Sequence, residues 1–260
     1  MSPFQWAAAS VQGRGHRRLA RNNQDAVAVS SSDEHLIALV CDGCGSGAHS
    51  EVGAKLGVKL LQRVLTANLF LYPTPDFWSA VRSHLLSQLK QLINRLDEDA
   101  AAMISDYFLF TIVGAILTPA ETTVFAIGDG VVAVNGEIQT WNYPDNAPPY
   151  LAYGLWQPQC SEWDWQFLHQ GPTAEIQSLL VGTDGVQDLL NFGDRSLPGK
   201  TEPVGELAQF WQDDRYFKNP DQLRRRLSVI NRDVQTPSQQ PGLLSDDTSL
   251  VVIRRRPEGA

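Results

Sequence analysis

Acidic residues recur in this chain at the ends of apolar, strand-like segments, and several are followed directly by glycine. The residues concerned are Asp25, Asp42-Gly43, Asp129-Gly130, Asp184-Gly185 and the Asp246-Asp247 pair. Glycine lets the backbone turn sharply and approach another group closely. An Asp-Gly dipeptide alone is a common turn, so it is the repetition of the pattern that indicates a shared site.

Carboxylates that converge from several strand ends, with backbone carbonyls beside them, make an all-oxygen site for a hard cation such as Mg²⁺ or Mn²⁺. Two such ions about 4 Å apart can share a bridging hydroxide that attacks an electrophile at neutral pH. The ions also neutralise the charge that develops on phosphate oxygens during phosphoester hydrolysis. Zinc fits less well, because no Cys and His residues here have the spacing of a zinc site.

Strands and two long helices are expected in the first part of the chain. Apolar runs predict strands at residues 7–12, 26–30 and 35–41, and apolar residues at three- and four-residue steps predict helices over 51–69 and 76–103. On the first helix, Val52, Leu56 and Leu61 are expected to share the buried face.

Strands dominate the expected structure of the second part. They are predicted at residues 108–117, 122–127, 131–134, 137–141, 175–181 and 248–254, with one helix at 220–234. Residues 143–173 are rich in Pro and aromatic side chains and are expected to form a long functional loop. Strand groups separated by helix pairs predict an α+β layered fold, and the absence of a repeat or linker predicts a single domain over residues 1–260.

The composition describes a globular protein and excludes several classes of function. The 260 residues carry 29 acidic and 21 basic side chains, a formal net charge of −8, which argues against a nucleic-acid partner. Three cysteines are too few for a disulfide scaffold. Neither a signal-peptide pattern nor a run of about 18 apolar residues occurs, so we expect a cytoplasmic protein with no membrane anchor. We also expect a monomer.

The order of these acidic motifs resembles the metal-dependent protein phosphatase family (PPM, protein phosphatase type 2C). The matching motifs are Asn22-Asn23-Gln24-Asp25, Asp42-Gly43, Phe110-Thr111 leading into Gly128-Asp129, Thr183-Asp184-Gly185 and Asp246-Asp247-Thr248-Ser249. The segment from Gly13 to His16 that precedes the first motif is similar to a bacterial-type branch. The resemblance implies a four-layer αββα sandwich of two antiparallel β-sheets flanked by helix pairs. It also implies Mn²⁺- or Mg²⁺-dependent hydrolysis of phosphoserine or phosphothreonine in a protein substrate, by a metal-bridging hydroxide.

Residue roles follow from the resemblance. Asp42 would bridge two metal ions, with the Gly43 carbonyl as a further ligand. Asp184 and Asp246 would bind the first ion, and Asp25 would act near the second. Asp129 would help to hold a third ion. Asp246 is assigned because the final motif of the family places its ligand three residues before a Ser or Thr, here Ser249; the alternative is Asp247.

Three positions depart from the family pattern. Gln24 stands where Glu is usual, Cys44 follows the Asp-Gly turn where many relatives have His, and Ala20 occupies the place of a phosphate-binding Arg. Arg21 or Arg17 would have to take the place of that arginine, and Arg21 is the nearer of the two in sequence. His16 is a candidate proton donor or phosphate ligand, because an imidazole titrates near neutral pH.

Two other functions remain open. The departures are compatible with a catalytically weak module of the same fold that binds a phosphorylated partner. The retained acidic cluster argues against it, because like charges are costly to hold together. A hydrolase of a small phosphorylated metabolite is the third possibility.

Overall fold

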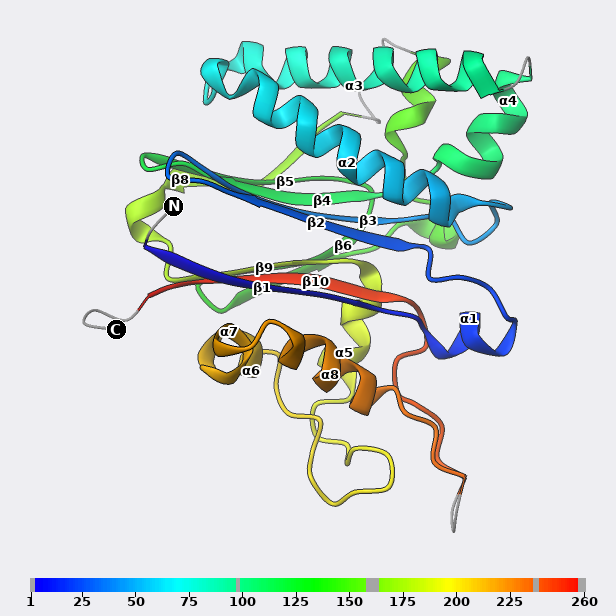
Figure 1. Ribbon diagram of the computed structural model, residues 1–260, viewed down its shortest axis with the longest axis vertical. Helices are drawn as coiled ribbons and strands as arrows, with labels where there is room; N and C mark the ends of the chain where they lie inside the picture. The colour runs from blue at the N-terminus through cyan, green and yellow to red at the C-terminus, as the bar shows by residue number, and fades with distance from the viewer. Residues whose placement is uncertain (1–2, 97–98, 158–163, 236–238, 257–260) are drawn as a thin grey trace.

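Two antiparallel β-sheets pack face to face, and helices cover the outer face of each sheet (Figure 1). The computed structural model describes residues 3–96, 99–157, 164–235 and 239–256. Within them the layers follow the order helices, sheet, sheet, helices. This confirms the expected α+β αββα sandwich.

In the described part of the chain the two sheets have five strands each. The first sheet, in spatial order, contains β2 (Asp25–Ser31), β3 (Leu36–Asp42), β4 (Ile112–Leu117), β5 (Glu121–Ile127) and β8 (Gln166–Pro172). The second contains β1 (Phe4–Val11), β10 (Thr248–Arg255), β9 (Ser178–Gly182), β6 (Gly130–Val134) and β7 (Glu137–Trp141). All neighbouring strands are antiparallel.

Two long helices cover the first sheet, and three short ones cover the second (Figure 1). These are α2 (Ser50–Asn68) and α3 (Pro75–Leu96), and then α6 (Gln209–Gln212), α7 (Arg215–Lys218) and α8 (Asp221–Ile230). The connections contain α1 (Arg14–Arg18), α4 (Ala100–Met103), α5 (Gln187–Asn191) and the π-helix η2 (Ile104–Phe108), with 3₁₀ turns η1 (Leu69–Leu71), η3 (Pro144–Asn146), η4 (Leu151–Leu155), η6 (Thr173–Glu175) and η7 (Asp184–Val186). No helix among the described residues is long and apolar enough to cross a membrane.

Strand β3 shows why the central strands are apolar along their whole length. Its alternate residues Ala38 and Val40 belong to the core between the sheets, whereas Leu39 and Cys41 belong to the core under α2 and α3. A strand that is buried on both faces has no polar face, so its sequence is a continuous apolar run. This rigid strand carries Asp42 at its end.

Helix α2 faces the sheet with different residues from those expected. Val52 and Leu56 are 41% and 39% exposed, which contradicts their predicted place on the buried face, although Leu61 is fully buried as expected. The buried side instead carries Gly53 and Gly57, because the backbone around Tyr107 and the ring of Phe110 pack too closely for a larger side chain.

Several boundaries also differ from the prediction. The expected helix over 76–103 ends at Leu96, and Asp99 begins a separate helix by accepting a hydrogen bond from the Ala102 amide at 3.0 Å. Residues 108–111 precede β4 and are not part of it, and the predicted helix over 220–234 ends at Ile230. The expected loop over 143–173 contains strand β8, and α1 forms where no helix was predicted.

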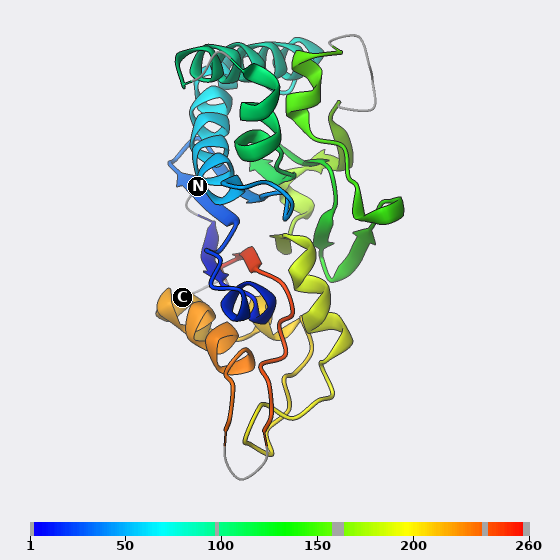
Figure 2. The same ribbon diagram turned by 90° about the vertical axis from the view of Figure 1, so that its right-hand side faces the viewer.

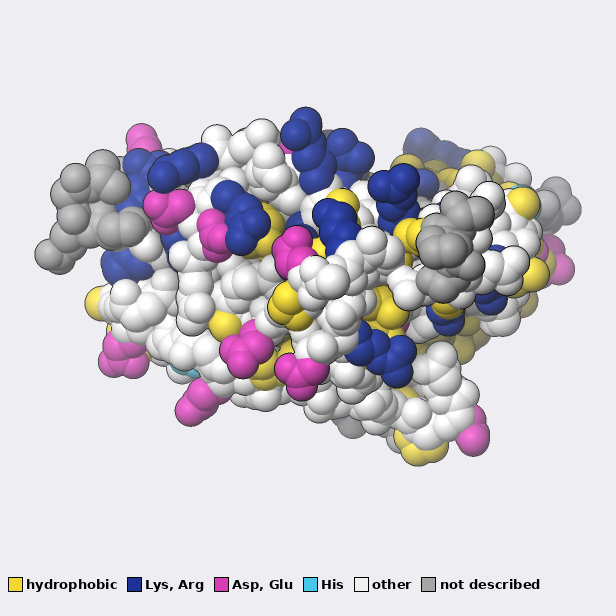
Figure 3. Space-filling view, turned by 90° about the horizontal axis from the view of Figure 1, so that it is seen from below, with side chains coloured by type: hydrophobic (Ala, Val, Ile, Leu, Met, Phe, Trp, Pro, Cys, Tyr) yellow, Lys and Arg dark blue, Asp and Glu magenta, His cyan; other side chains and the backbone are white. Residues whose placement is uncertain are grey.

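The face that carries α8 presents basic side chains interspersed with acidic ones (Figure 3). Arg226 lies 2.5 Å from Glu202, and Arg254 lies 2.7 Å from Asp214. The two arginine side chains are mostly buried and their acidic partners are about half exposed, so acidic groups interrupt the positive charge of this face.

Candidate active site

The acidic motifs meet at one end of the sandwich, the end that Figure 2 faces. Asp25 begins β2 and Asp42 ends β3, and the two residues are register partners. From the other strands, Asp129 lies in the turn between β5 and β6, and Asp184 directly follows Thr183 at the end of β9. Asp246 precedes β10. Both sheets therefore contribute carboxylates to the same end of the molecule.

A cleft of about 450 Å³ opens among these strand ends. Asp42, Asp129, Asp184 and Asp246 line it. Asp25 lies beneath, only 2% exposed, and its Oδ2 accepts a hydrogen bond from the Thr183 hydroxyl at 2.8 Å. The residues that sequence motifs had placed in one metal site are thus brought together.

The protein environment disfavours the ionised form of these acids. Burial raises the pKa of Asp42 well above its usual range, and the carboxylates of Asp25 and Asp184 raise it further. Burial is also the main cause of the raised pKa values of Asp25 and Asp129. Burial, together with the carboxylate of Asp246, raises the pKa of Asp184 to about 6. A cation placed among these groups would stabilise their ionised forms.

Unpaired oxygen atoms mark the same place. Among the described residues, the buried side-chain oxygens that lack a hydrogen-bond partner include Oδ1 of Asp25, Oδ1 of Asp184 and Oε1 of Gln24. A buried polar atom without a partner is costly, and hard divalent cations are bound by oxygen ligands of this kind. The donor set therefore fits Mg²⁺ or Mn²⁺.

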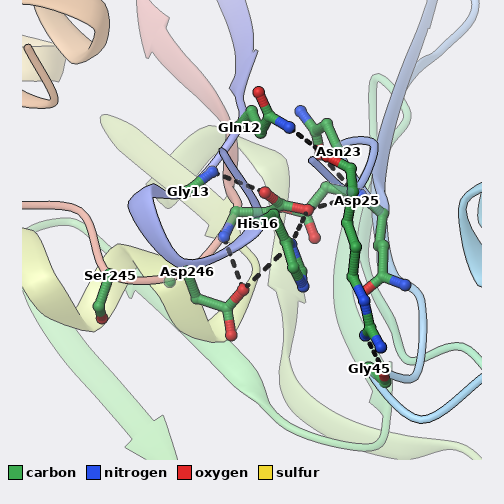
Figure 4. Close-up of polar contacts among 12 residues, drawn as sticks. Gln12, Gly13, His16, Asn23, Asp25, Gly45, Ser245 and Asp246 are labelled. Carbon is green, nitrogen blue, oxygen red and sulfur yellow. Dashed lines mark hydrogen bonds and ion pairs between the residues drawn. The ribbon is translucent and has the colours of Figure 1, made fainter. Parts of the chain in front are cut away.

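Asp247 is buried and anchors two other chain segments. Its Oδ1 accepts a hydrogen bond from the backbone amide of Gly13 at 2.6 Å, and its Oδ2 accepts one from the backbone amide of Gln24 at 2.5 Å. His16 Nδ1 lies 2.8 Å from the same Oδ2. In contrast, the side chain of Asp246 is 57% exposed and lines the cleft beside His16 (Figure 4). The geometry thus separates a buried, anchoring acid from an acid whose exposed side chain lines the cleft and accepts a hydrogen bond only from the Asp247 backbone amide among the contacts described.

His16, Asp246 and Asp247 form a compact group whose ligand atoms lie within 4.8 Å of one another. Both oxygens of Asp247 already accept hydrogen bonds from the protein. Of the two acids, Asp246 is the one that lines the cleft.

The other predicted polar residues lie around the cleft. His16 and Gln24 line it, and the side-chain nitrogen Nε2 of Gln24 donates to the Ser50 hydroxyl at 2.7 Å. Arg21 is exposed at the rim, where its guanidinium donates to the carbonyl of Gly45 at 2.7 Å. Gly43 follows Asp42 and forms a single β-bridge with Phe110.

One wall of the cleft comes from the segment 143–173, which was expected to be functional although none of its residues was predicted individually. Tyr150, Asp145 and Asn146 line it together with Cys44. Burial and a hydrogen-bonding contact with Cys44 raise the pKa of the Tyr150 hydroxyl, which therefore stays protonated. Asp145 and Asn146 have positive φ angles of 56° and 52°, a rare backbone conformation that is often found at functional sites. The only signal in the sequence was the Pro and aromatic content of this segment.

Known structures show the same fold. A bacterial serine phosphatase superposes with a TM-score of 0.61 at 12% identity, covering 99% of this chain and 100% of that one. PppA, a regulatory component of the T6SS in Pseudomonas aeruginosa, gives a TM-score of 0.58 at 13% identity, with 97% and 98% covered. The serine/threonine phosphatase Stp1 from Staphylococcus aureus gives 0.55 at 12% identity, with 98% and 96% covered. The molecule is thus an αββα sandwich of the kind seen in bacterial serine/threonine phosphatases.

The family is shown by the sequence itself. The model of the family described as protein phosphatase 2C matches residues 12–228. The chain therefore belongs to the protein phosphatase 2C (PPM) family, whose members act on phosphorylated proteins and generally use divalent metal ions. No curated protein matches the sequence.

Proposed function

We propose that this chain, acting as a single domain, is a divalent-metal-dependent phosphatase that hydrolyses phosphoserine or phosphothreonine in a protein substrate. The observation that carries the proposal is the convergence of Asp42, Asp184 and Asp246 on one cleft, with a buried oxygen of Asp184 left unpaired. A pocket built only to recognise a phosphate dianion would present cations or amide groups to it, because carboxylates repel phosphate.

The ligand roles follow the positions of the acids. Asp42, Asp184 and Asp246 would hold Mn²⁺ or Mg²⁺ at the cleft surface, with Asp25 beneath them and Asp129 at the far wall. The carbonyl of Gly43 would add a neutral oxygen. When bound, such ions supply an activated water molecule and neutralise charge on the phosphate oxygens.

The remaining polar residues would orient the substrate. The Arg21 guanidinium lies at the rim, where it can meet the phosphate as it enters, since a planar guanidinium matches phosphate geometry. Asp247 holds His16 through Nδ1, so Nε2 is the ring nitrogen left to exchange a proton with the substrate. Tyr150 remains protonated and can donate a hydrogen bond from the opposite wall.

Hydrolysis of p-nitrophenyl phosphate and of a phosphoserine peptide, in EDTA and then with added Mn²⁺ or Mg²⁺, tests the proposal. We expect metal-dependent turnover that falls at least about a hundredfold in Asp42→Asn. The matched control is Asp233→Asn, because Asp233 is exposed and pairs with Arg17 away from the cleft; this variant should retain wild-type turnover.

The competing functions give different results in the same assay. Calorimetry that shows tight Mn²⁺ binding without turnover would support a phosphoprotein-binding module, which the substitutions at Ala20, Gln24 and Cys44 favour. Faster turnover of sugar or nucleoside phosphates than of the phosphopeptide would instead support a metabolite hydrolase.

A further inference from the structure

A second hollow adjoins the acidic cleft and shares one wall with it. The hollow measures about 740 Å³. The residues that line both spaces are Cys44, Ser46, Asn146, Pro148 and Tyr150. A molecule whose phosphate group occupies the cleft therefore has this hollow next to it.

The wall away from the cleft is apolar and is held firmly by the core. It contains Leu109, Pro149, Tyr153 and Trp165, and we call this hollow the apolar groove. The Trp165 ring lies 5.4 Å from the rings of both Trp78 and Phe125, measured between centroids. Its indole nitrogen donates to the Trp78 carbonyl at 3.3 Å. A wall fixed in this way is formed before any ligand arrives.

Charge is confined to one edge of the apolar groove. Among its described lining residues, Asp164 is the one acid or base, and its exposed carboxylate lies 3.9 Å from Arg82. An acidic side chain would be repelled by Asp164 and by the neighbouring cleft. An apolar side chain would gain the free energy of leaving water and would meet no unpaired charge.

We propose that the apolar groove binds an apolar side chain of the phosphoprotein substrate, located within about three residues of the phosphorylated serine or threonine. This inference rests on the proposed function, because it assumes that the phosphate lies in the cleft among Asp42 and its neighbours. An extended chain advances about 3.3–3.6 Å per residue, so the positions next to the phosphorylated residue are the ones that can cross the shared wall. The groove then selects among phosphoproteins, whereas the cleft carries out the reaction.

Glycine-flanked phosphoserine peptides test the proposal. A single leucine, glutamate or lysine replaces glycine at each position up to the third on either side, and kcat/KM is measured with Mn²⁺. We expect leucine at one position to raise kcat/KM about tenfold over glycine, the size of effect that a hydrophobic pocket gives. Glutamate at that position should lower it.

A variant of the groove provides the second comparison. Ala147 is exposed in the wall of the apolar groove, so Ala147→Asp adds a charge there without disturbing the core. We expect this variant to lose the preference for leucine, expressed as the ratio of leucine to glycine peptide. The matched control is Ala174→Asp, which places the same charge on exposed η6 at the other end of β5 and should keep the wild-type ratio.

The outcomes separate the two proposals. Three results would overturn the role of the groove, provided that p-nitrophenyl phosphate is still hydrolysed. The first is a ratio of kcat/KM for leucine and glycine peptides near one at every position, and the second is a preference for a charged residue. The third is a leucine preference that persists in Ala147→Asp. Absence of turnover on every substrate contradicts the proposed function instead. In that case anisotropy of fluorescein-labelled leucine and glycine peptides gives the same comparison from binding alone.

Discussion

Asp42 and Asp184 line the same cleft, although Asp42 ends a strand of one sheet and Asp184 follows a strand of the other. Two carboxylates repel unless a proton or a cation lies between them. Without metal the proton fills this role, which links the stability of the sandwich to pH.

Metal-free protein should lose stability as the pH rises through about 6. The folded state raises the pKa of Asp184 from 3.8 to about 6, so between these values it binds more protons than the unfolded chain. The stabilisation is complete below about pH 4, falls as the pH rises towards about 6, and is absent above that pH. Urea unfolding in EDTA measures the free energy of unfolding. Between pH 4.5 and 7.5 this free energy should fall by roughly 2 kcal/mol more in the wild type than in Asp184→Asn. Parallel pH profiles for the two proteins would contradict this account.

Substitutions of the two neighbouring acids should have opposite effects. Asp247→Ala removes a buried carboxylate that accepts hydrogen bonds from Gly13, Gln24 and His16, and it should cost about 3 kcal/mol of unfolding free energy. Asp246→Ala should change stability by less than about 0.5 kcal/mol but weaken Mn²⁺ binding at least tenfold. Chemical denaturation and calorimetry measure the two quantities, and the reverse pattern would make Asp247 the ligand.

Replacement of Gly13 should disturb the site without touching a carboxylate. A Cβ at this position would overlap the backbone of Asp246, so the segment before β10 must move. We expect Gly13→Ala to lower kcat/KM for p-nitrophenyl phosphate at least about tenfold, because small displacements of catalytic groups are costly. Gly171→Ala is the control, since its Cβ would make only ordinary contacts of 3.6 Å or more. Equal activity of the two variants would show that the position of Asp246 is not critical.

Arg21 should act on substrate binding more than on the chemical step. Arg21→Ala removes a cation from the rim of the cleft and should raise KM for a phosphopeptide about fivefold, with little change in kcat. Arg18→Ala removes an exposed charge from nearby α1 and controls for the general loss of positive charge. If both variants raise KM equally, the effect is one of long-range attraction and not of contact.

Local patterns allowed the sequence to predict most strands and the acids at their ends. The Asp-Gly turns after β3 and between β5 and β6 could be predicted, because in each case a buried apolar run stops at a turn residue. This signal lies within a few residues of sequence. The buried face of α2 was predicted incorrectly in part. Helical periodicity favours burial of the apolar Val52 over Gly53, but the backbone of Tyr107 leaves room only for a glycine on the buried side.

Features that depend on distant contacts could not be predicted in this way. Gly13 and Asp247 lie 234 positions apart in sequence, and nothing near either residue indicates their hydrogen bond. Strand β8 is a half-exposed edge strand with a bulge opposite Val124 and Phe125, which breaks the alternation that marks a strand. The position of Tyr150 in the wall of the cleft was not predicted either, because tertiary packing alone brings this residue to the cleft.

The position of β10 has a consequence for newly synthesised molecules. This strand is the last of the ten described strands in sequence, yet it lies between β1 and β9 in its sheet, with Asp246 just before it. A chain still on the ribosome that has not been extended through Arg255 has no partner for β1 and no complete acidic cluster. The acidic cleft therefore assembles only after β10 has been synthesised, although its other acids belong to segments that are made earlier.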